Sequence, residues 1–313
     1  MSRRTQEHER HTHSAEVHQA YERVVAAAEV DSRYVEVSGR QVHLLEKGTG
    51  PPLVLLHGTA GTAGFMLPLL NELHGVRVLA PDRPGNGLSD PIDLARRRYR
   101  ETTVAWLDRL LDTLELETTA LAGHSGGAMW ALWYALAHPE RVTRLVLIGP
   151  PAVPKTRLAL PIRLAATFGV GELLPRLVPP SPKSTLRFAH HAAREKETLA
   201  EYPDQIALMV AEGRDPTTAA VGRAELRAVT SPFGLLWPSG IPGRSRVRPD
   251  ELHRVVVPTL MVWGERDPLG DASVARTVTE LIPGARLVVL PTGHGPWLGQ
   301  PARTAETIGE FLR

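Results

Sequence analysis

One serine lies in a sequence pattern that could make it a nucleophile. Residues Gly123–Gly127 read Gly-His-Ser-Gly-Gly and follow a short apolar run. This Gly-x-Ser-x-Gly pattern is typical of a strand that turns at once into a helix, which strains the serine backbone and exposes its hydroxyl. Gly123 and Gly127 leave room where side chains would clash, and the helix would aim free N–H groups at the reacting centre. The pattern predicts Ser125 as a nucleophile, with a flexible surface turn as the alternative.

A base and an orienting acid must accompany such a serine, because its hydroxyl is a poor nucleophile at neutral pH. Downstream of Ser125 the sequence supplies Asp267 in Gly-Glu-Arg-Asp and His294 in Gly-His-Gly. Each follows a predicted strand, Thr259–Trp263 for the acid and Leu287–Leu290 for the histidine. Three suitable residues in the order nucleophile, acid, histidine, each at the end of a strand, predict a catalytic triad.

Each of the two partners also has a purely structural interpretation. Asp267 could cap the helix predicted to start near Ala272, and His294 could be an ordinary loop residue. Glu265 is a rival for the acid, but it lies nearer the strand and we expect it to point elsewhere. The combination, rather than any single residue, supports the triad.

Backbone N–H groups are needed to stabilise the negative charge of the transition state. One such donor commonly contributes roughly two to three orders of magnitude in rate. We expect the first donor to be the N–H of Gly126 and the second to be that of Thr59, in the loop His57–Gly61. A tight turn is the structural alternative for that loop. Trp297, which follows His294 closely, is predicted to line the substrate pocket.

Length and composition limit the class of protein. The chain has 313 residues, of which 42% are hydrophobic, enough for one large domain or a domain with an insertion. A net charge of +2 gives no reason to expect nucleic acid as a partner. There is no cysteine, and the polar N-terminus offers no secretory signal. We expect a soluble, cytoplasmic enzyme that acts on a small molecule, uses no cofactor and has no membrane partner; the oligomeric state stays open.

Four histidines in residues 1–30 raise the question of a metal-binding arm. They are His8, His11, His13 and His18. No cluster of carboxylates or cysteines completes a ligand set with them. We therefore favour a solvated, partly helical or disordered N-terminal extension and expect no metal site.

From Tyr34 onward, short β-rich runs alternate with helical ones. A hairpin is expected first, and the later strands are almost continuously apolar. Such strands, separated by helices, predict a mostly parallel central sheet covered on both faces, an α/β fold. Strands are expected at 34–37, 41–46, 53–56, 76–80, 118–122, 145–148, 259–263 and 287–290, and helices at 67–73, 103–114, 126–137, 272–281 and 302–312.

The alternation breaks for about a hundred residues rich in proline, arginine and leucine. We expect residues 152–252 to be a mostly helical insertion that divides a core of residues 31–151 and 253–313. An insertion that leaves from the end of a strand is placed to roof a site at the carboxyl edge of the sheet.

The insertion is expected to select the substrate. It has 14 lysines and arginines against 10 aspartates and glutamates. A preference for acidic substrates is one interpretation of this excess, and solvated helix faces are the simpler one. Some of its large apolar side chains could line a pocket, although most are expected in its own core: Phe168, Phe188, Met209, Phe233 and Trp237.

The motifs together resemble the α/β-hydrolase superfamily. The resemblance rests on His57-Gly58, Asp82–Ser89, Gly123–Gly127, Gly264–Asp267 and Gly293-His294. It is closest to the capped branch, which includes esterases, carbon–carbon bond hydrolases, epoxide hydrolases and haloalkane dehalogenases. It covers about residues 34–151 and 253–313, and it implies the α/β-hydrolase fold, with residues 152–252 as the cap. It also implies Ser125 as nucleophile, Asp267 as acid and His294 as base.

Two departures from that family pattern are informative. Epoxide hydrolases and haloalkane dehalogenases have an aspartate nucleophile, so Ser125 argues against both chemistries. Members often carry glutamate within the segment that matches Pro296–Pro301, where this chain has Gly299. We expect that change to alter the support of the His294 loop. The stretch Asp82–Ser89 is expected to be a structural turn beside the oxyanion loop.

These inferences predict a serine hydrolase that cleaves a carboxylic ester or a related carbonyl compound through an acyl-enzyme. Acyl transfer, perhydrolysis and carbon–carbon bond hydrolysis are alternatives that use the same triad. A small-molecule sensor that keeps the fold without turnover is an alternative from a different class.

Overall fold

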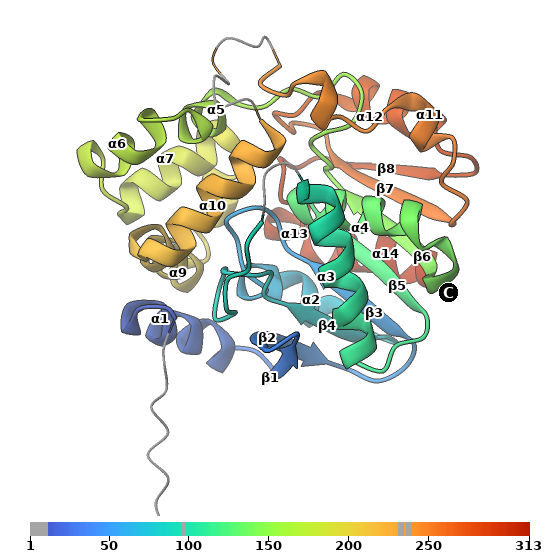
Figure 1. The fold of residues 1–313 in the computed structure, drawn as a ribbon, viewed down its shortest axis with the longest axis horizontal. Helices are drawn as coiled ribbons and strands as arrows, with labels where there is room; N and C mark the ends of the chain where they lie inside the picture. The colour runs from blue at the N-terminus through green and yellow to red at the C-terminus, as the bar shows by residue number, and fades with distance from the viewer. Residues whose placement is uncertain (1–11, 95–97, 231–234, 236–238) are drawn as a thin grey trace, which may run out of the picture.

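The computed structural model describes residues 12–94, 98–230, 235 and 239–313. Among these residues, eight strands form one sheet in the order β1-β2-β4-β3-β5-β6-β7-β8 (Figure 1). β2 runs antiparallel to β1 and β4, and the other neighbouring pairs are parallel. The strands are β1 (Asp31–Val37), β2 (Arg40–Lys47), β3 (Pro52–Leu56), β4 (Arg77–Pro81), β5 (Thr119–His124), β6 (Val142–Ile148), β7 (Thr259–Gly264) and β8 (Arg286–Leu290).

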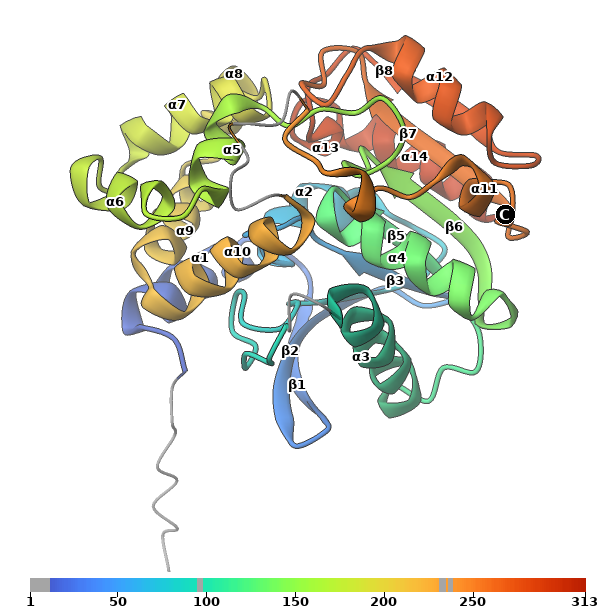
Figure 2. The same cartoon turned by 45° about the horizontal axis from the view of Figure 1, so that its top comes forward.

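Helices cover both faces of this sheet, because its central strands are apolar on both sides. Every residue of β5 and β7 is buried. One hydrophobic core lies against α3 (Tyr99–Thr113), α4 (Gly126–Ala137) and α12 (Ala272–Glu280), and Figure 2 shows α3 and α4 in front of the strands. A second core includes α2 (Leu67–Glu72), α13 (Pro296–Gly299) and α14 (Pro301–Leu312). The predicted α/β fold, a mostly parallel sheet between helices, is confirmed.

The segment between β6 and β7 is helical in the residues described, and we refer to residues 152–252 as the helical insertion. Figures 1 and 2 show α5 to α10 gathered into one group beside the sheet. Its helices are α5 (Leu160–Ala166), α6 (Val170–Leu177), α7 (Pro182–Ala192), α8 (Lys196–Leu199), α9 (Pro203–Arg214), α10 (Pro216–Val229) and α11 (Pro249–Leu252).

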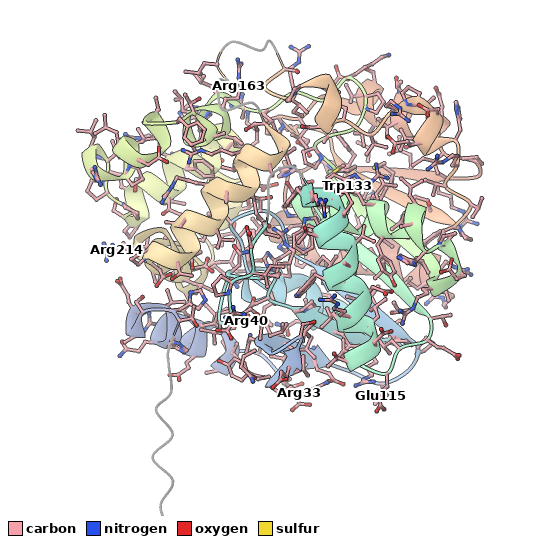
Figure 3. The ribbon with its side chains drawn as sticks, viewed as in Figure 1. Arg33, Arg40, Glu115, Trp133, Arg163 and Arg214 are labelled. Atoms are coloured by element: carbon pink, nitrogen blue, oxygen red, sulfur yellow. The ribbon has the colours of Figure 1, made fainter. Side chains whose placement is uncertain are left out.

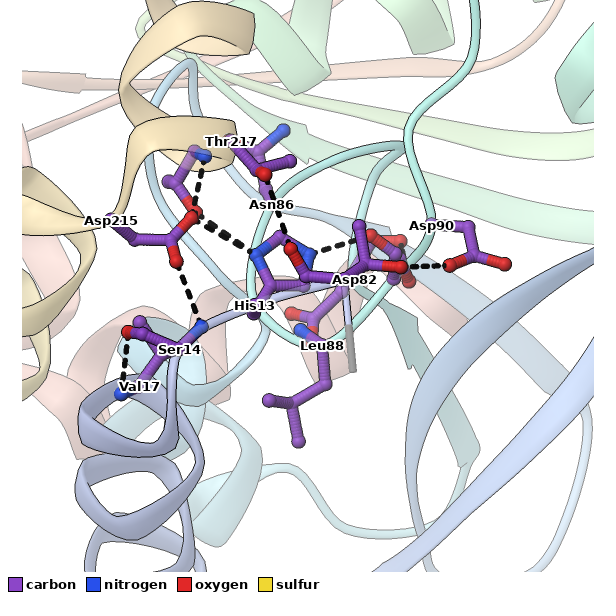
Figure 4. Close-up of polar contacts among 12 residues, drawn as sticks. His13, Ser14, Val17, Asp82, Asn86, Leu88, Asp90, Asp215 and Thr217 are labelled. Carbon is purple, nitrogen blue, oxygen red and sulfur yellow. Dashed lines mark hydrogen bonds and ion pairs between the residues drawn. The ribbon is translucent and has the colours of Figure 1, made fainter. Parts of the chain in front are cut away.

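The described part of the N-terminal extension is folded onto the rest of the molecule. Helix α1 (Ala15–Ala26) packs beside α9 (Figure 1), and His13 is buried. The His13 ring contacts the Ser89 carbonyl oxygen through Nε2 at 2.9 Å and the Asp215 carboxylate through Nδ1 at 3.3 Å (Figure 4). The Ser14 backbone N–H donates to the same carboxylate at 2.8 Å. We refer to residues 12–26 as the N-terminal latch, since they join α10 to the core.

Helix α1 bears out the partly helical extension that was expected, but the expectation of solvation was wrong for His13 and for the buried face of α1. The physical reason is that both ring nitrogens of His13 contact buried partners from two distant segments. Polar groups that are paired in this way can be buried. His8 and His11 lie outside the described residues. Within the described ranges, no group of three or more His, Asp or Glu side chains could hold a metal ion. No described helix has the length and hydropathy that a bilayer crossing needs.

Candidate active site

The backbone of Ser125 turns sharply between β5 and α4. Its φ of 51° and ψ of −118° lie where residues other than glycine are rarely found. The turn is held by the Ser125 N–H, which donates to the carbonyl of Ile148 on β6 at 2.8 Å. Helix α4 begins at the next residue, so its first N–H groups are close to the serine.

Two glycines permit this turn because the backbone passes very close to each of them. A Cβ added at Gly123 would collide with the backbone carbonyl of Gly127. A Cβ added at Gly127 would collide with the carbonyl oxygens of Leu56 and His57. The motif is therefore a steric requirement of the strand-to-helix turn.

The structure brings Asp267 and His294 together. His294 Nδ1 lies 2.7 Å from Asp267 Oδ2, and the second carboxylate oxygen accepts the Leu269 N–H at 2.9 Å. Gly149 makes room for the pair, because a Cβ there would lie 3.0 Å from both side chains. Glu265 is exposed, as expected for the rival that points elsewhere.

Ser125 and His294 line the same cavity, which has a volume of about 220 Å³. Between these two described side chains no hydrogen bond is formed in this structure. Such contacts are commonly long in a ligand-free site and shorten when substrate binds. The arrangement leaves Nε2 of His294 as the ring atom available to exchange a proton with the serine.

Burial alone would lower the pKa of the His294 ring, but the Asp267 carboxylate opposes it through charge and a hydrogen bond. With a smaller contribution from Glu195, the pKa is raised above the ordinary histidine value. The neighbouring His124 has the opposite environment, since burial and the His294 ring lower its pKa well below that value. His124 is therefore neutral, and its Nε2–H donates to the His294 carbonyl at 3.0 Å.

The loop after β3 lies beside the first turn of α4. A Cβ built on Gly126 would lie 3.2 Å from the Thr59 backbone nitrogen, so these two residues are close neighbours. The loop turns at Ala60, whose φ is 53°. The two N–H donors expected from the sequence are thus near each other and near the serine.

His57 fixes the start of that loop. Its Nε2 accepts the Arg83 backbone N–H at 2.8 Å, so its Nδ1 carries the proton and donates to the Gly58 carbonyl at 2.8 Å. Burial, followed by the nearby Arg83 charge, lowers the pKa of His57 to about 3, which keeps this neutral form. Asp82 holds the end of the loop by accepting the Ala63 N–H at 2.7 Å. The Asp82–Ser89 stretch thus supports the loop, as expected.

The cavity is bounded by the sheet edge on one side and by α7, α9 and α10 on the other. Of the insertion's large apolar residues, Phe188 and Met209 line it. Phe168 is exposed and stacks on Arg227 instead. Phe233 and Trp237 lie outside the described residues. Trp133 of α4 also lines the cavity.

The structure does not place Trp297 in the wall of this cavity. Its side chain is fully buried behind His124, with ring centroids 4.5 Å apart, and its Nε1 donates to the Phe65 carbonyl at 3.1 Å. The predicted substrate contact is corrected accordingly: the short helix α13 turns Trp297 inward, toward the hydrophobic core.

All the acidic side chains that line the cavity are glutamates: Glu195, Glu212 and Glu225. Among the described lining residues there is no lysine or arginine. Figure 3 shows two of the insertion's arginines, Arg163 and Arg214, at the periphery of the molecule. The basic excess of the insertion therefore gives no support for acidic substrates.

Glu195 is a site residue that the sequence reasoning missed. It is buried in the insertion, and its Oε1 accepts the Gly295 backbone N–H at 3.3 Å. The His294 backbone N–H donates at 2.8 Å to the carbonyl of Ala193, which lies two residues before Glu195. Two glycines carried the sequence signal: a Cβ at Gly293 would collide with the Ala193 carbonyl and Glu195, and one at Gly299 would lie 3.0 Å from Thr198 of the same segment. The insertion thus supports the His294 loop.

Comparisons with known proteins agree with this fold. A family model described as alpha/beta hydrolase fold matches residues 51–298. The chain is 29% identical to a 2-hydroxymuconate semialdehyde hydrolase from Pseudomonas sp. strain CF600, covering 90% of this chain and 93% of that protein. It is 27% identical to a pimeloyl-[acyl-carrier protein] methyl ester esterase from Shewanella sp. strain MR-7, covering 87% and 94%.

A solved structure supports the fold independently. The carboxylesterase CesB from Bacillus subtilis aligns with a TM-score of 0.73 at 24% identity, covering 95% of this chain and 96% of that one. With the family match extending over most of the sequence, the chain belongs to the alpha/beta hydrolase fold family.

Proposed function

We propose that this hydrolase cleaves uncharged carboxylic esters through an acyl-enzyme formed on Ser125. The observation that carries the proposal is one cavity containing a backbone-strained serine and a histidine paired with a buried aspartate. These are the groups that a serine nucleophile requires. The helical insertion serves as the cap that encloses and selects the substrate.

In the first half of the reaction, Ser125 Oγ attacks the ester carbonyl carbon while His294 Nε2 accepts the hydroxyl proton. The electron pair of the carbonyl moves onto its oxygen, which the N–H groups of Thr59 and Gly126 stabilise. Asp267 holds the ring and stabilises its positive charge. Collapse of the intermediate breaks the bond to the alcohol, which leaves with the proton from His294.

In the second half, His294 takes a proton from water, and the hydroxide oxygen attacks the acyl carbon. The same N–H groups stabilise the second oxyanion. Its collapse releases the carboxylic acid, and the proton returns from His294 to Ser125. No group beyond the triad and water is needed to balance the reaction.

Ester cleavage is favoured over carbon–carbon bond cleavage by the lack of a lysine or arginine among the described residues that line the cavity. The relatives include both classes, and the carbon–carbon hydrolases are named for semialdehydes and dienoates, the latter being carboxylates. A buried carboxylate requires a cationic or strongly hydrogen-bonding partner. The described lining offers three glutamates and neither lysine nor arginine.

The direct test replaces Ser125 with alanine. The Ser125→Ala variant should lose about a thousandfold or more of its kcat on p-nitrophenyl esters, because the nucleophile is gone. Ser273→Ala, at the exposed start of α12, serves as the control and should keep wild-type rates. A fluorophosphonate probe should add to wild type but not to Ser125→Ala, as read by intact mass. Wild-type turnover by Ser125→Ala would refute the mechanism.

A further inference from the structure

We propose that Gln205 and Glu212 on α9 form a polar subsite of the cavity that binds a hydroxyl or carboxamide group of the substrate. The inference rests on the proposed function, because the subsite lies in the same cavity as Ser125. It names the substrate class more narrowly: an ester with an uncharged polar group away from the scissile bond.

Glu212 is the one of the three lining glutamates that keeps a carboxyl oxygen without a partner, although the Gly87 backbone N–H donates to its carboxyl. Glu225 makes two hydrogen bonds to Arg83, at 2.8 and 3.0 Å. Glu195 holds the backbone of the His294 loop. Glu212 is also buried, but its Oε1 has no hydrogen-bond partner. A buried polar atom without a partner is costly and uncommon, so a ligand group that pairs with it is strongly favoured.

Gln205 presents a second unpaired atom of the same kind. Its Nε2 donates to the Gly64 carbonyl at 2.7 Å, which fixes the orientation of the amide. The amide oxygen Oε1 is left buried and without a partner, and the residue lines the cavity. This oxygen can only accept, so it calls for a donor on the substrate.

The helix places the two residues on one side. They are seven positions apart, which is close to two turns, so their side chains leave α9 in nearly the same direction about 10 Å apart. Leu208 and Met209 lie between them and also line the cavity. The insertion therefore presents an apolar stripe with a polar atom at each end, which suits a chain-like substrate.

Glu212 is expected to be neutral. Burial raises the pKa of its carboxyl well above the usual value, and the negative charge of Asp82 adds to the effect. A neutral carboxyl has one O–H donor as well as an acceptor. Together with the amide oxygen of Gln205, it matches groups that both donate and accept, such as a hydroxyl or a primary carboxamide.

The experiment compares two series of substrates. In the first, p-nitrophenyl esters carry acyl chains of equal length that end in methyl, hydroxyl, carboxamide or trimethylammonium. In the second, acetate esters carry the same four groups on the alcohol. The subsite should receive either the acyl or the alcohol part of the ester, so the preference is expected in one of the two series. In that series, wild type should prefer hydroxyl or carboxamide over methyl by about tenfold or more in kcat/KM, since a site built for a hydrogen bond rejects an analogue that lacks it.

Variants assign that preference to the subsite. Glu212→Met and Gln205→Met should each remove most of it, while Glu212→Gln, which keeps a donor and an acceptor, should retain it. Asp204→Asn, at an exposed position of the same helix that does not line the cavity, is the matched control and should leave the preference unchanged. If Glu212→Met fails to fold, Glu212→Gln and Gln205→Met still decide the question.

Two results would overturn the subsite. Equal kcat/KM for all four groups in both series would mean that the buried polar atoms serve the fold alone. A preference for trimethylammonium would mean an anionic subsite instead. In either case the substrates whose chains end in methyl would still be hydrolysed, and Ser125 would still be labelled by the fluorophosphonate probe. These two readouts separate failure of the subsite from failure of the proposed hydrolase.

Discussion

At the scale of single residues, His294 responds to two carboxylates from different parts of the chain. Asp267 follows β7 and bonds directly to the ring at 2.7 Å. Glu195 comes from the helical insertion and acts through the loop backbone and through its charge. The third titratable neighbour, His124, has its ring centroid 4.6 Å away and is neutral because its pKa is lowered. The basicity of the ring therefore depends on the insertion as well as on the core.

This arrangement predicts the pH dependence of the reaction. Only the neutral His294 ring can accept the serine proton, so kcat/KM rises with pH as the ring loses its own proton. Because the pKa of His294 is raised, the protonated ring persists to higher pH, and the acid limb should lie above the ordinary histidine value of about 6.5. Glu195→Gln removes one negative charge and should move that limb to lower pH.

The control for this variant lies on α8, the short helix that Glu195 precedes. Glu197 is exposed and two residues away, so Glu197→Gln should leave the acid limb of kcat/KM where it is in wild type. A role for Glu195 limited to packing would lower the plateau rate or the stability without moving the limb. An unmoved limb in Glu195→Gln would therefore contradict the electrostatic role.

At the scale of elements, the turn between β5 and α4 depends on backbone contacts rather than on side-chain packing. A Cβ at Gly123 would collide with the Gly127 carbonyl, so Gly123→Ala must shift either β5 or α4. We expect the substitution to cost about 1–3 kcal/mol in the free energy of unfolding, as overpacking does, and to reduce kcat by misplacing the serine. Urea unfolding and p-nitrophenyl ester kinetics measure the two effects.

A second glycine provides the matched comparison. Gly309 lies in α14, and a Cβ there would meet no atom within 4 Å. Gly309→Ala should therefore be neutral or should stabilise the protein by up to about 1 kcal/mol, because alanine loses less backbone entropy in a helix. If both substitutions changed stability alike, the collision at the turn would not be the reason for Gly123.

The elements of the core were predictable because each carries a local signal. Apolar runs such as 118–122 and 259–263 predict strands, and a residue just after a parallel strand must lie at the carboxyl edge. That rule predicted Asp267 and His294 at the same edge of the sheet, and in the structure their side chains are in contact there. The positions of Gly123 and Gly127 followed from the same local turn.

The rest required contacts between distant segments, which periodicity does not encode. Glu195, Gln205 and Glu212 occupy ordinary helical positions, and nothing local shows that their side of the insertion faces the sheet edge. Trp297 is next to the histidine loop in sequence, yet helix α13 turns it into the core. His13 looked solvated because its buried partners, Ser89 and Asp215, come from far along the chain.

At the scale of the whole molecule, two of the buried polar connections between the helical insertion and the core, among the residues described, meet in the turn Asp82–Asp90. The N-terminal latch bonds to Asp215 at the start of α10 and to the Asp82–Asp90 turn (Figure 4). Two turns or more further along α10, Glu225 pairs with Arg83. Both connections end in the turn Asp82–Asp90, which also holds the loop that begins at His57. The position of the insertion and the shape of the site are therefore linked.

The Arg83–Glu225 pair is the connection whose energetics can be tested most sharply. Both side chains are fully buried, and the Arg83 guanidinium also lies 4.5 Å from the Trp130 ring centroid. Removing one charge leaves the other unpaired in the interior, so Glu225→Leu and Arg83→Met alone should each lower the free energy of unfolding by about 3–5 kcal/mol. The double variant Arg83→Met with Glu225→Leu has no unpaired charge and should recover much of that loss. Urea unfolding of the single and double variants measures the coupling.

The exposed pair Arg214–Glu16, with the same separation of 2.8 Å, is the comparison, and Glu16→Gln should change the free energy of unfolding by no more than about 1 kcal/mol. Losses in the double variant equal to the sum of the single ones would show that the two side chains act independently, and the insertion would then be fastened by the latch and by apolar packing instead.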